Sequence, residues 1–172
     1  VQATYNTTGT GSSQPEGIVT GSAAGVTAAS TTAFTADEVL DLIHSVDPSY
    51  RSASTGFMLH DTIIKYLRKM KTADGQFLWQ PGLQAGVADR LAGYPITLNQ
   101  NMDSALTTGK KLLLFGDFSN YFIRQVKGIQ VVRLNELYAE NGQVGFMAFM
   151  RFDGGLVDAG MHPVKYLQNS AA

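Results

Sequence analysis

Three residues of this sequence stand out as candidates for acid–base chemistry. His60 and Asp61 are adjacent, and a carboxylate beside an imidazole favours the imidazolium form, as in general-base catalysis. Asp117 follows an apolar run, a common position for a catalytic carboxylate in α/β folds. Each residue also has a simpler role, because aspartate caps helices and bonds to its own turn. We favour the simpler roles, and a cytosolic hydrolase using His60 and Asp117 is the enzymatic alternative.

Two glycine-containing stretches partly match phosphate-binding loops. Gly9-Thr10-Gly11 begins like a dinucleotide fingerprint, but Gln14 stands where the third glycine belongs. Gly109-Lys110 ends like a Walker loop, but Ser104 replaces the upstream glycine and Lys111 replaces the residue that holds magnesium. The nucleophile elbow, the zinc-protease motif and the calcium loop are all missing from the sequence. The sequence therefore predicts no enzymatic activity, no cofactor and no metal site.

Aromatic and basic residues offer two weaker candidates for binding. Phe77, Trp79 and Tyr94 would line a ligand pocket if the chain were a monomeric binding module, although alternating aromatics usually belong to a core. A run of basic residues would suit an anionic partner, but more often such a run is the solvated face of a helix. Its members are Lys65, Arg68, Lys69 and Lys71.

The composition narrows the classes of protein further. The 172 residues carry a formal net charge of −1 and no strongly basic run, which argues against specific nucleic-acid binding. With 0 cysteines there is neither a disulfide framework nor a thiolate site, so a cytosolic origin fits best. Neither a secretory signal nor a membrane-length apolar run occurs in the sequence. We predict a soluble α+β protein that does not insert into membranes.

The elements that must position these residues begin after residue 33. Residues 1–33 are rich in Gly, Ser, Thr and Ala, so we expect a mobile arm or an extended strip lying on another surface. Thr35 and Glu38 have capping-box spacing, which predicts a helix that ends before Asp47-Pro48. Residues 56–59 read as a buried strand leading into a second helix, which is capped by Asp61 and ends at the turn of residues 74–75.

Strands are expected in the rest of the chain. The predicted strands cover residues 94–98, 111–115, 121–125, 129–133 and 143–152. Turns are predicted at Asn141-Gly142 and at Asp153-Gly154. Strand 143–152 is apolar on both faces, so we expect a partner subunit or a further segment to cover one of them. The polar loop Arg133, Glu136, Glu140 and Asn141 reads by itself as a hairpin connection.

Five blocks of sequence resemble, in order, the major capsid proteins of tailed phages of the Hong Kong 97 type. They are GTGSSQPEGIV (9–19), LRKMKTADGQFLWQP (67–81), LAGYPI (91–96), LFGDFSNY (114–121) and GQVGF to RFDGG (142–155). The resemblance runs nearly end to end but covers only the C-terminal part of that family. It implies a chain lacking the N-terminal arm, the E-loop and the spine helix.

The resemblance also implies an organisation and a function. Residues 34–130 would form the A-domain core, and residues 131–172 the returning P-domain strands and a C-terminal strand. Strand 143–152 would pack on the spine helix of the intact protein. Arg133, Glu136, Glu140 and Asn141 would lie at contacts between capsomers.

The expected role is structural: self-assembly into pentamers and hexamers of an icosahedral, DNA-containing head of a phage or prophage. Scaffold and portal proteins are expected partners, and the protein would pass through the bacterial cytoplasm before entering the virion. An encapsulin-like bacterial nanocompartment shell is the nearest alternative.

Overall fold

The most apolar run of the sequence forms a central strand of a mixed sheet. In the computed structural model, which describes residues 2–52, 54–71 and 90–171, β5 (Lys111–Asp117) is fully buried from Leu112 to Phe115. The six-stranded sheet has the order β1-β8-β5-β2-β4-β3. Its other strands are β1 (Ala23–Thr27), β2 (Thr55–Leu59), β3 (Arg90–Leu91), β4 (Tyr94–Leu98) and β8 (Val164–Gln168).

Both faces of this sheet are covered, which explains why β5 is apolar on both sides. Leu113 and Phe115 pack in a core with α3 (Ala36–Ser45) and α4 (Asp61–Lys69). Leu114 faces the other way and packs with residues of α2 (Ile18–Gly21). Each fully buried Leu or Phe contributes about 1.5–3 kcal/mol of transfer free energy. The expected α+β class is therefore confirmed.

Helix α3 begins where the capping box predicts. The Glu38 N–H donates to Thr35 Oγ1 at 3.3 Å, and the Thr35 N–H donates to Glu38 Oε2 at 2.7 Å. Phe34 and Val39, which flank the cap, are both buried in the same core. The helix ends at Ser45, and the Asp47 carboxylate accepts the Ser49 N–H at the start of η1 (Pro48–Tyr50).

Helix α4 follows β2 directly, as expected, but its cap differs from the prediction. His60, and not Asp61, is the N-cap: His60 Nδ1 accepts the N–H of Thr62 at 3.1 Å. Asp61 occupies the first helical turn, where its negative charge favours the helix dipole. Ile63, Ile64 and Leu67 form the buried stripe of the helix. The predicted turn at 74–75, together with Phe77 and Trp79, lies outside the described residues.

The N-terminal segment is more structured than an extended strip. It contains α1 (Gln2–Thr8), α2 and β1, and Ile18 and Val19 are buried against the sheet. Two glycines allow the chain to cross itself closely, because the Gly17 N–H donates to the Gly9 carbonyl at 2.8 Å. A Cβ at Gly9 would lie only 2.1 Å from the Pro15 carbonyl oxygen. The small residues, which in the sequence suggested a mobile arm or an extended strip, therefore permit close packing of the chain.

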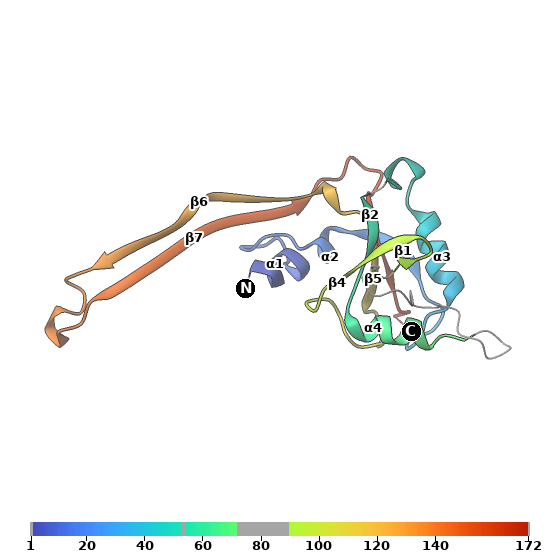
Figure 1. Ribbon diagram of the computed structural model, residues 1–172, viewed down its shortest axis with the longest axis horizontal. Coiled ribbons are helices and arrows are strands. Elements are labelled where there is room, and N and C mark those ends of the chain that lie inside the picture. The colour runs from blue at the N-terminus through green and yellow to red at the C-terminus, as the bar shows by residue number, and fades with distance from the viewer. Residues whose placement is uncertain (1, 53, 72–89, 172) are drawn as a thin grey trace.

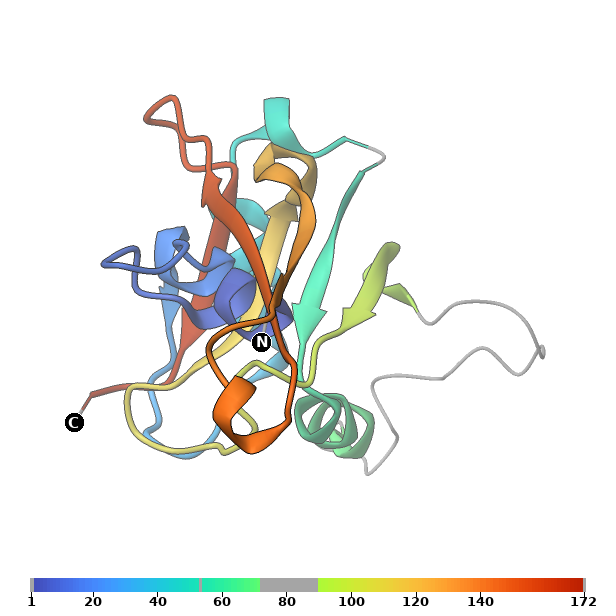
Figure 2. The same cartoon turned by 90° about the vertical axis from the view of Figure 1, so that its left-hand side faces the viewer.

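A long two-stranded hairpin projects from this body (Figures 1 and 2). Its strands are β6 (Tyr121–Leu134) and β7 (Gly145–Leu156), which pair antiparallel from end to end. The prediction of two separate strands at 121–125 and 129–133 is wrong. A register shift between Val126 and Gln130 interrupts the apolar alternation while the pairing continues on both sides, and Lys127 adopts a positive φ of 54° there.

The two turns predicted around this hairpin have different outcomes. Gly142 has a φ of 65° and caps η3 (Ala139–Asn141), so the turn at Asn141-Gly142 is confirmed. No turn occurs at Asp153-Gly154, because these residues pair with Arg124 and Ile123 inside the hairpin. Gly154 is needed for a tertiary reason, since a Cβ there would lie 2.6 Å from the Tyr121 hydroxyl oxygen.

The expected division between residues 130 and 131 does not coincide with a structural break. Residue 130 lies inside β6, which continues to Leu134. Strand β8, from the C-terminal part, returns to the body and lies between β1 and β5. The described structure thus consists of a body that includes both ends of the described chain and a hairpin of residues 121–156. Short η2 (Phe118–Asn120) connects the two.

Candidate interaction surface

The fold does not bring together His60 and Asp117, the two residues considered for a hydrolase. Strands β2 and β5 are antiparallel, with Thr55 opposite Asp117 and Leu59 opposite Leu113. His60 follows Leu59, so it lies at the other end of the strand from Asp117, about 16 Å away at ~3.3 Å per residue. This separation is far beyond hydrogen-bond reach. A hydrolase that uses His60 together with Asp117 is therefore incompatible with the structure.

Asp117 has the structural role that its turn suggested. Its Oδ1 accepts the N–H of Ser119 at 3.0 Å and the Ser119 hydroxyl at 2.6 Å. The carboxylate therefore caps η2, where the chain leaves the body for the hairpin. The side chain is occupied by its own turn, as an Asx turn requires.

Two further sequence candidates for ligand chemistry, Lys110 and Tyr94, have structural contacts of their own. Lys110 is paired with Asp103 at 3.1 Å. Tyr94 packs edge-on against Phe57 and Phe115, which supports its assignment to the core. Over residues 2–52, 54–71 and 90–171, no group of three or more His, Asp or Glu side chains is arranged to hold a metal ion. Within the same ranges, no helix is long and apolar enough to cross a membrane.

The largest unusual feature is the apolar surface of the hairpin. Successive residues of a strand point to opposite faces of a sheet, and cross-strand partners share a face. Because exposed apolar residues occur at consecutive positions, they lie on both faces of the hairpin. Phe146 is 71% exposed and Ile129 is 68% exposed. The other large apolar residues exposed on the two strands are Phe122, Ile123, Val126, Val131, Val132, Met147 and Phe149. An exposed apolar surface of this extent is typical of an interaction site.

The four residues predicted for inter-subunit contacts gather at or near the far end of the hairpin. Arg133 lies near the end of β6, opposite Phe146. Glu136, Glu140 and Asn141 belong to the connection between the strands, and all four residues are exposed. The loop is therefore a hairpin connection, as its sequence indicated.

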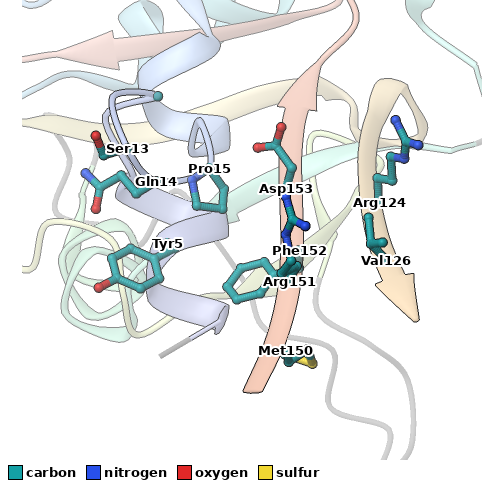
Figure 3. A pocket seen from close by; sticks show the side chains of 11 residues that line it. Tyr5, Ser13, Gln14, Pro15, Arg124, Val126, Met150, Arg151, Phe152 and Asp153 are labelled. Atoms are coloured by element: carbon teal, nitrogen blue, oxygen red, sulfur yellow. The ribbon is translucent and has the colours of Figure 1, made fainter. Parts of the chain in front are cut away.

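A cavity of about 820 Å³ lies at the opposite end of the hairpin, beside the N-terminal segment (Figure 3). Its walls combine α1 and the loop after it with both hairpin strands. We call it the arginine pocket and define it by Tyr5, Gln14, Arg124, Arg151, Phe152 and Asp153. The sequence analysis did not identify this site, because its two walls are more than 100 residues apart in the chain.

The root of the hairpin is joined to the N-terminal segment by specific bonds. The Tyr121 hydroxyl donates to the Glu16 carbonyl at 2.8 Å, and the Glu16 N–H donates to the Gly154 carbonyl at 3.0 Å. Burial raises the pKa of the Tyr121 hydroxyl, and the carboxylates of Asp153 and Glu16 raise it further. The hydroxyl therefore stays protonated and able to donate at neutral pH.

Lys111 joins the same segment to the sheet. Its ammonium group donates to the Val19 carbonyl at 2.8 Å and lies 4.0 Å from the centre of the Tyr166 ring. Partial burial lowers the pKa of Lys111, and this effect exceeds the opposing attraction of Asp103. The carbonyl and the aromatic ring replace part of the hydration that the ammonium loses.

Comparison with solved structures identifies the class of fold. The chain is similar to two structures described as the capsid of a native and of an empty GTA particle, computed with C5 symmetry, with TM-scores of 0.82 and 0.81 and 29% identity in each case. Each match covers 98% of this chain but 60% of the GTA capsid chain. This chain therefore has the fold of part of a capsid protein.

A more distant structure has the same fold. The structure titled Microbacterium phage Oxtober96 matches with a TM-score of 0.66 and 20% identity, covering 90% of this chain and 55% of that chain. A search of curated proteins returned no match.

The family comparison gives the identification. The model of the phage capsid family matches residues 2–168, so this chain belongs to the phage capsid family. The resemblance to tailed-phage capsid proteins, and the expected partial Hong Kong 97-type fold, are therefore confirmed. The chain spans about 60% of the length of the GTA capsid chains that it matches.

Proposed function

We propose that this chain is the shell-forming part of a major capsid protein from a tailed phage or prophage. The observation that carries the proposal is the hairpin of residues 121–156, whose apolar side chains are exposed on both faces of a two-stranded sheet. Such a ribbon is marginally stable alone, so its stability has to come from contacts with further chain. In an assembled shell those contacts come from neighbouring subunits and from the rest of the capsid protein.

We propose the A-domain and P-domain of the family for this chain, with limits that differ from those expected from the sequence. The body, which contains β1 to β5 and β8, would be the A-domain, and the hairpin of residues 121–156 would supply P-domain strands. The spine helix of the intact protein would cover one apolar face of β7. This division is supported by the sheet pairing, since β8 joins the body and not the hairpin.

The proposed assembly consists of pentamers and hexamers that close into an icosahedral head containing DNA. Heterologous contacts between identical subunits close into rings of this kind without a reaction centre. Arg133, Glu136, Glu140 and Asn141 would contact neighbouring capsomers, a role supported by their exposure at the end of the hairpin. Scaffold and portal proteins are the proposed additional partners, and the subunits would be made in the bacterial cytoplasm.

The proposed role involves no catalysis, no cofactor and no sequence-specific binding of DNA. The separation of His60 from Asp117 supports this part of the proposal. An encapsulin-like shell enclosing a protein cargo would use similar contacts. The similarity to GTA and phage capsids favours the phage assignment.

The experiment is electron microscopy of two preparations. The 172-residue chain alone is expected to remain monomeric or to form small oligomers. The same chain expressed with the sequence encoded upstream of it is expected to form closed icosahedral shells. Regular shells from the 172-residue chain alone would contradict the expected dependence on further chain. Failure of the longer product to assemble with a scaffold protein present would contradict the proposed function.

A further inference from the structure

The connection at the far end of the hairpin and the pocket at its near end have net charges of opposite sign, although Arg133 lies near the far end and Asp153 in the pocket. The far end has Glu136 and Glu140 on either side of Leu137 and Tyr138, which are 65% and 45% exposed. The arginine pocket at the near end is lined by Arg124, Arg151 and Asp153, and Figure 3 shows the Phe152 ring turned towards Tyr5 while Arg124 lies on the other strand. The pocket therefore has two positive charges and one negative charge, whereas residues 135–143 at the far end have two negative charges, and both surfaces offer apolar contact area.

The arginines of the pocket are free to accept an anionic partner. Among the described residues, neither Arg124 nor Arg151 forms a salt bridge. Arg124 lies opposite Asp153 across the strands, so the Asp153 carboxylate, whose Oδ1 accepts the Gly154 N–H at 2.9 Å, offsets part of the positive charge of the arginines. The pocket volume of about 820 Å³ is within the ~300–1,000 Å³ range of sites that enclose a ligand or several side chains. Guanidinium groups bind carboxylates in a planar, two-bonded geometry.

The acidic end is a folded surface and not a loose loop. We call residues 135–143 the acidic knob. The Tyr138 carbonyl accepts the N–H groups of Asn141 and Gln143 at 3.1 and 3.2 Å. The Tyr138 ring lies over Gly145, where a Cβ would be only 3.0 Å from the ring edge. A surface that is already ordered loses less entropy on binding.

These two surfaces cannot meet within one molecule. Arg124 and Leu134 are ten positions apart along β6, which corresponds to about 30 Å of strand. We propose that the acidic knob of one copy binds in the arginine pocket of a second copy. The contact is heterologous, because it joins two different patches, and it can therefore build rings. The inference rests on the proposed shell-forming role and names the partner of one of its contacts.

Disulfide trapping tests the contact directly, because the chain has 0 cysteines of its own. The double variant Gln14→Cys/Ala139→Cys places one thiol in the pocket and one in the knob. We expect disulfide-linked dimers and larger oligomers at low salt, formed about tenfold faster than at 1 M salt, where the Debye length falls to ~3 Å. The control Lys65→Cys/Ala139→Cys keeps the knob thiol but moves the other to the exposed face of α4. Equal rates in the two double variants would overturn the proposal.

Charge reversal in the same cysteine background separates the knob from other occupants. Arg151→Glu and Glu140→Arg are each expected to slow trapping by about tenfold, and an equimolar mixture of the two is expected to restore it, because like charges facing each other oppose binding. The matched controls Lys65→Glu and Asp41→Arg make the same charge changes on exposed helix positions and should have no effect. Loss of trapping with Arg151→Glu but not with Glu140→Arg would show that the charge of the knob does not contribute to the contact, and would overturn the proposal.

A further experiment separates a failure of the knob contact from a failure of the proposed capsid function. The chain carrying its upstream sequence is imaged with and without the charge reversals. Shells that form equally well in all variants would reject the knob contact while supporting the capsid role. An absence of shells in every variant, including the unmodified chain, would count against the capsid role itself.

Discussion

The hydroxyl group of Tyr121 lies 2.8 Å from the main-chain carbonyl oxygen of Glu16 and donates a hydrogen bond to it. The same residue, Glu16, donates its own N–H to Gly154 on the other strand of the hairpin. One residue of the N-terminal segment is therefore bonded to both hairpin strands. This attachment holds the root of the hairpin to the body, and Pro15 and Asp153, which adjoin the bonded residues in the chain, line the arginine pocket.

Replacing Tyr121 with phenylalanine should loosen this attachment. We expect the free energy of unfolding to fall by about 1–2 kcal/mol, because the Glu16 carbonyl loses its side-chain donor while the ring is retained. Urea denaturation measures the loss, and hydrogen exchange should show weaker protection of the Glu16 N–H. Tyr138→Phe is the matched control, since that tyrosine is 45% exposed. Equal losses in the two variants would contradict the role assigned to Tyr121.

Gly116 should not tolerate a side chain. Its φ is 152°, and a Cβ would lie 2.1 Å from the main-chain oxygen of Pro163. Gly116→Ala must therefore separate β5 from β8 locally, and we expect a loss of several kcal/mol, as for other strained or overpacked sites (~1–3 kcal/mol or more). Gly128→Ala is the control, because nothing lies within 4 Å of its Cβ position. Soluble yield and thermal unfolding compare the two, and similar melting temperatures would refute the steric argument.

Two leucines, one buried and one exposed, test which part of the fold contributes most to its stability. Leu113 is 0% exposed in β5, whereas Leu137 is 65% exposed in the acidic knob. We expect Leu113→Ala to cost about 2–5 kcal/mol of unfolding free energy. Leu137→Ala should change it by less than about 0.5 kcal/mol. Denaturation of both variants in guanidinium measures the difference, and a large loss for Leu137→Ala would mean that the hairpin end contributes to the core.

The loop between β7 and β8 should respond to acid through Asp158. Slight burial raises the pKa of this carboxyl, but hydrogen bonds from the His162 and Gly160 N–H groups, and the His162 ring, outweigh it and lower the pKa below 3.8. The loop is therefore stabilised above that pH, and the stabilisation is lost as pH falls through the folded-state pKa. The amide NMR signals of Gly160 and His162 should shift together below pH 3.8. This titration should vanish in Asp158→Asn, and a midpoint above 3.8 would contradict the assignment.

Local features of the fold were predictable from the sequence. The capping box at Thr35 and Glu38 is made by residues three apart, so the start of α3 depends only on nearby atoms. The buried strands β2 and β5 were also recognisable, because runs of apolar residues need cover on both faces. Continuity of β6 was not predictable, since the register shift between Val126 and Gln130 breaks the period that identifies a strand.

The sequence by itself determined the family, through the order of its motifs, and it determined the helices and buried strands that depend on neighbouring residues. Only the tertiary structure decided that His60 and Asp117 are far apart, that Ile18 and Val19 are buried, and that two arginines share a pocket with the N-terminal segment. The physical reason is that strand register and chain crossing bring together residues distant in the chain. The hydrogen bond of Tyr121 to Glu16 spans 105 positions, and no local pattern in the sequence encodes it.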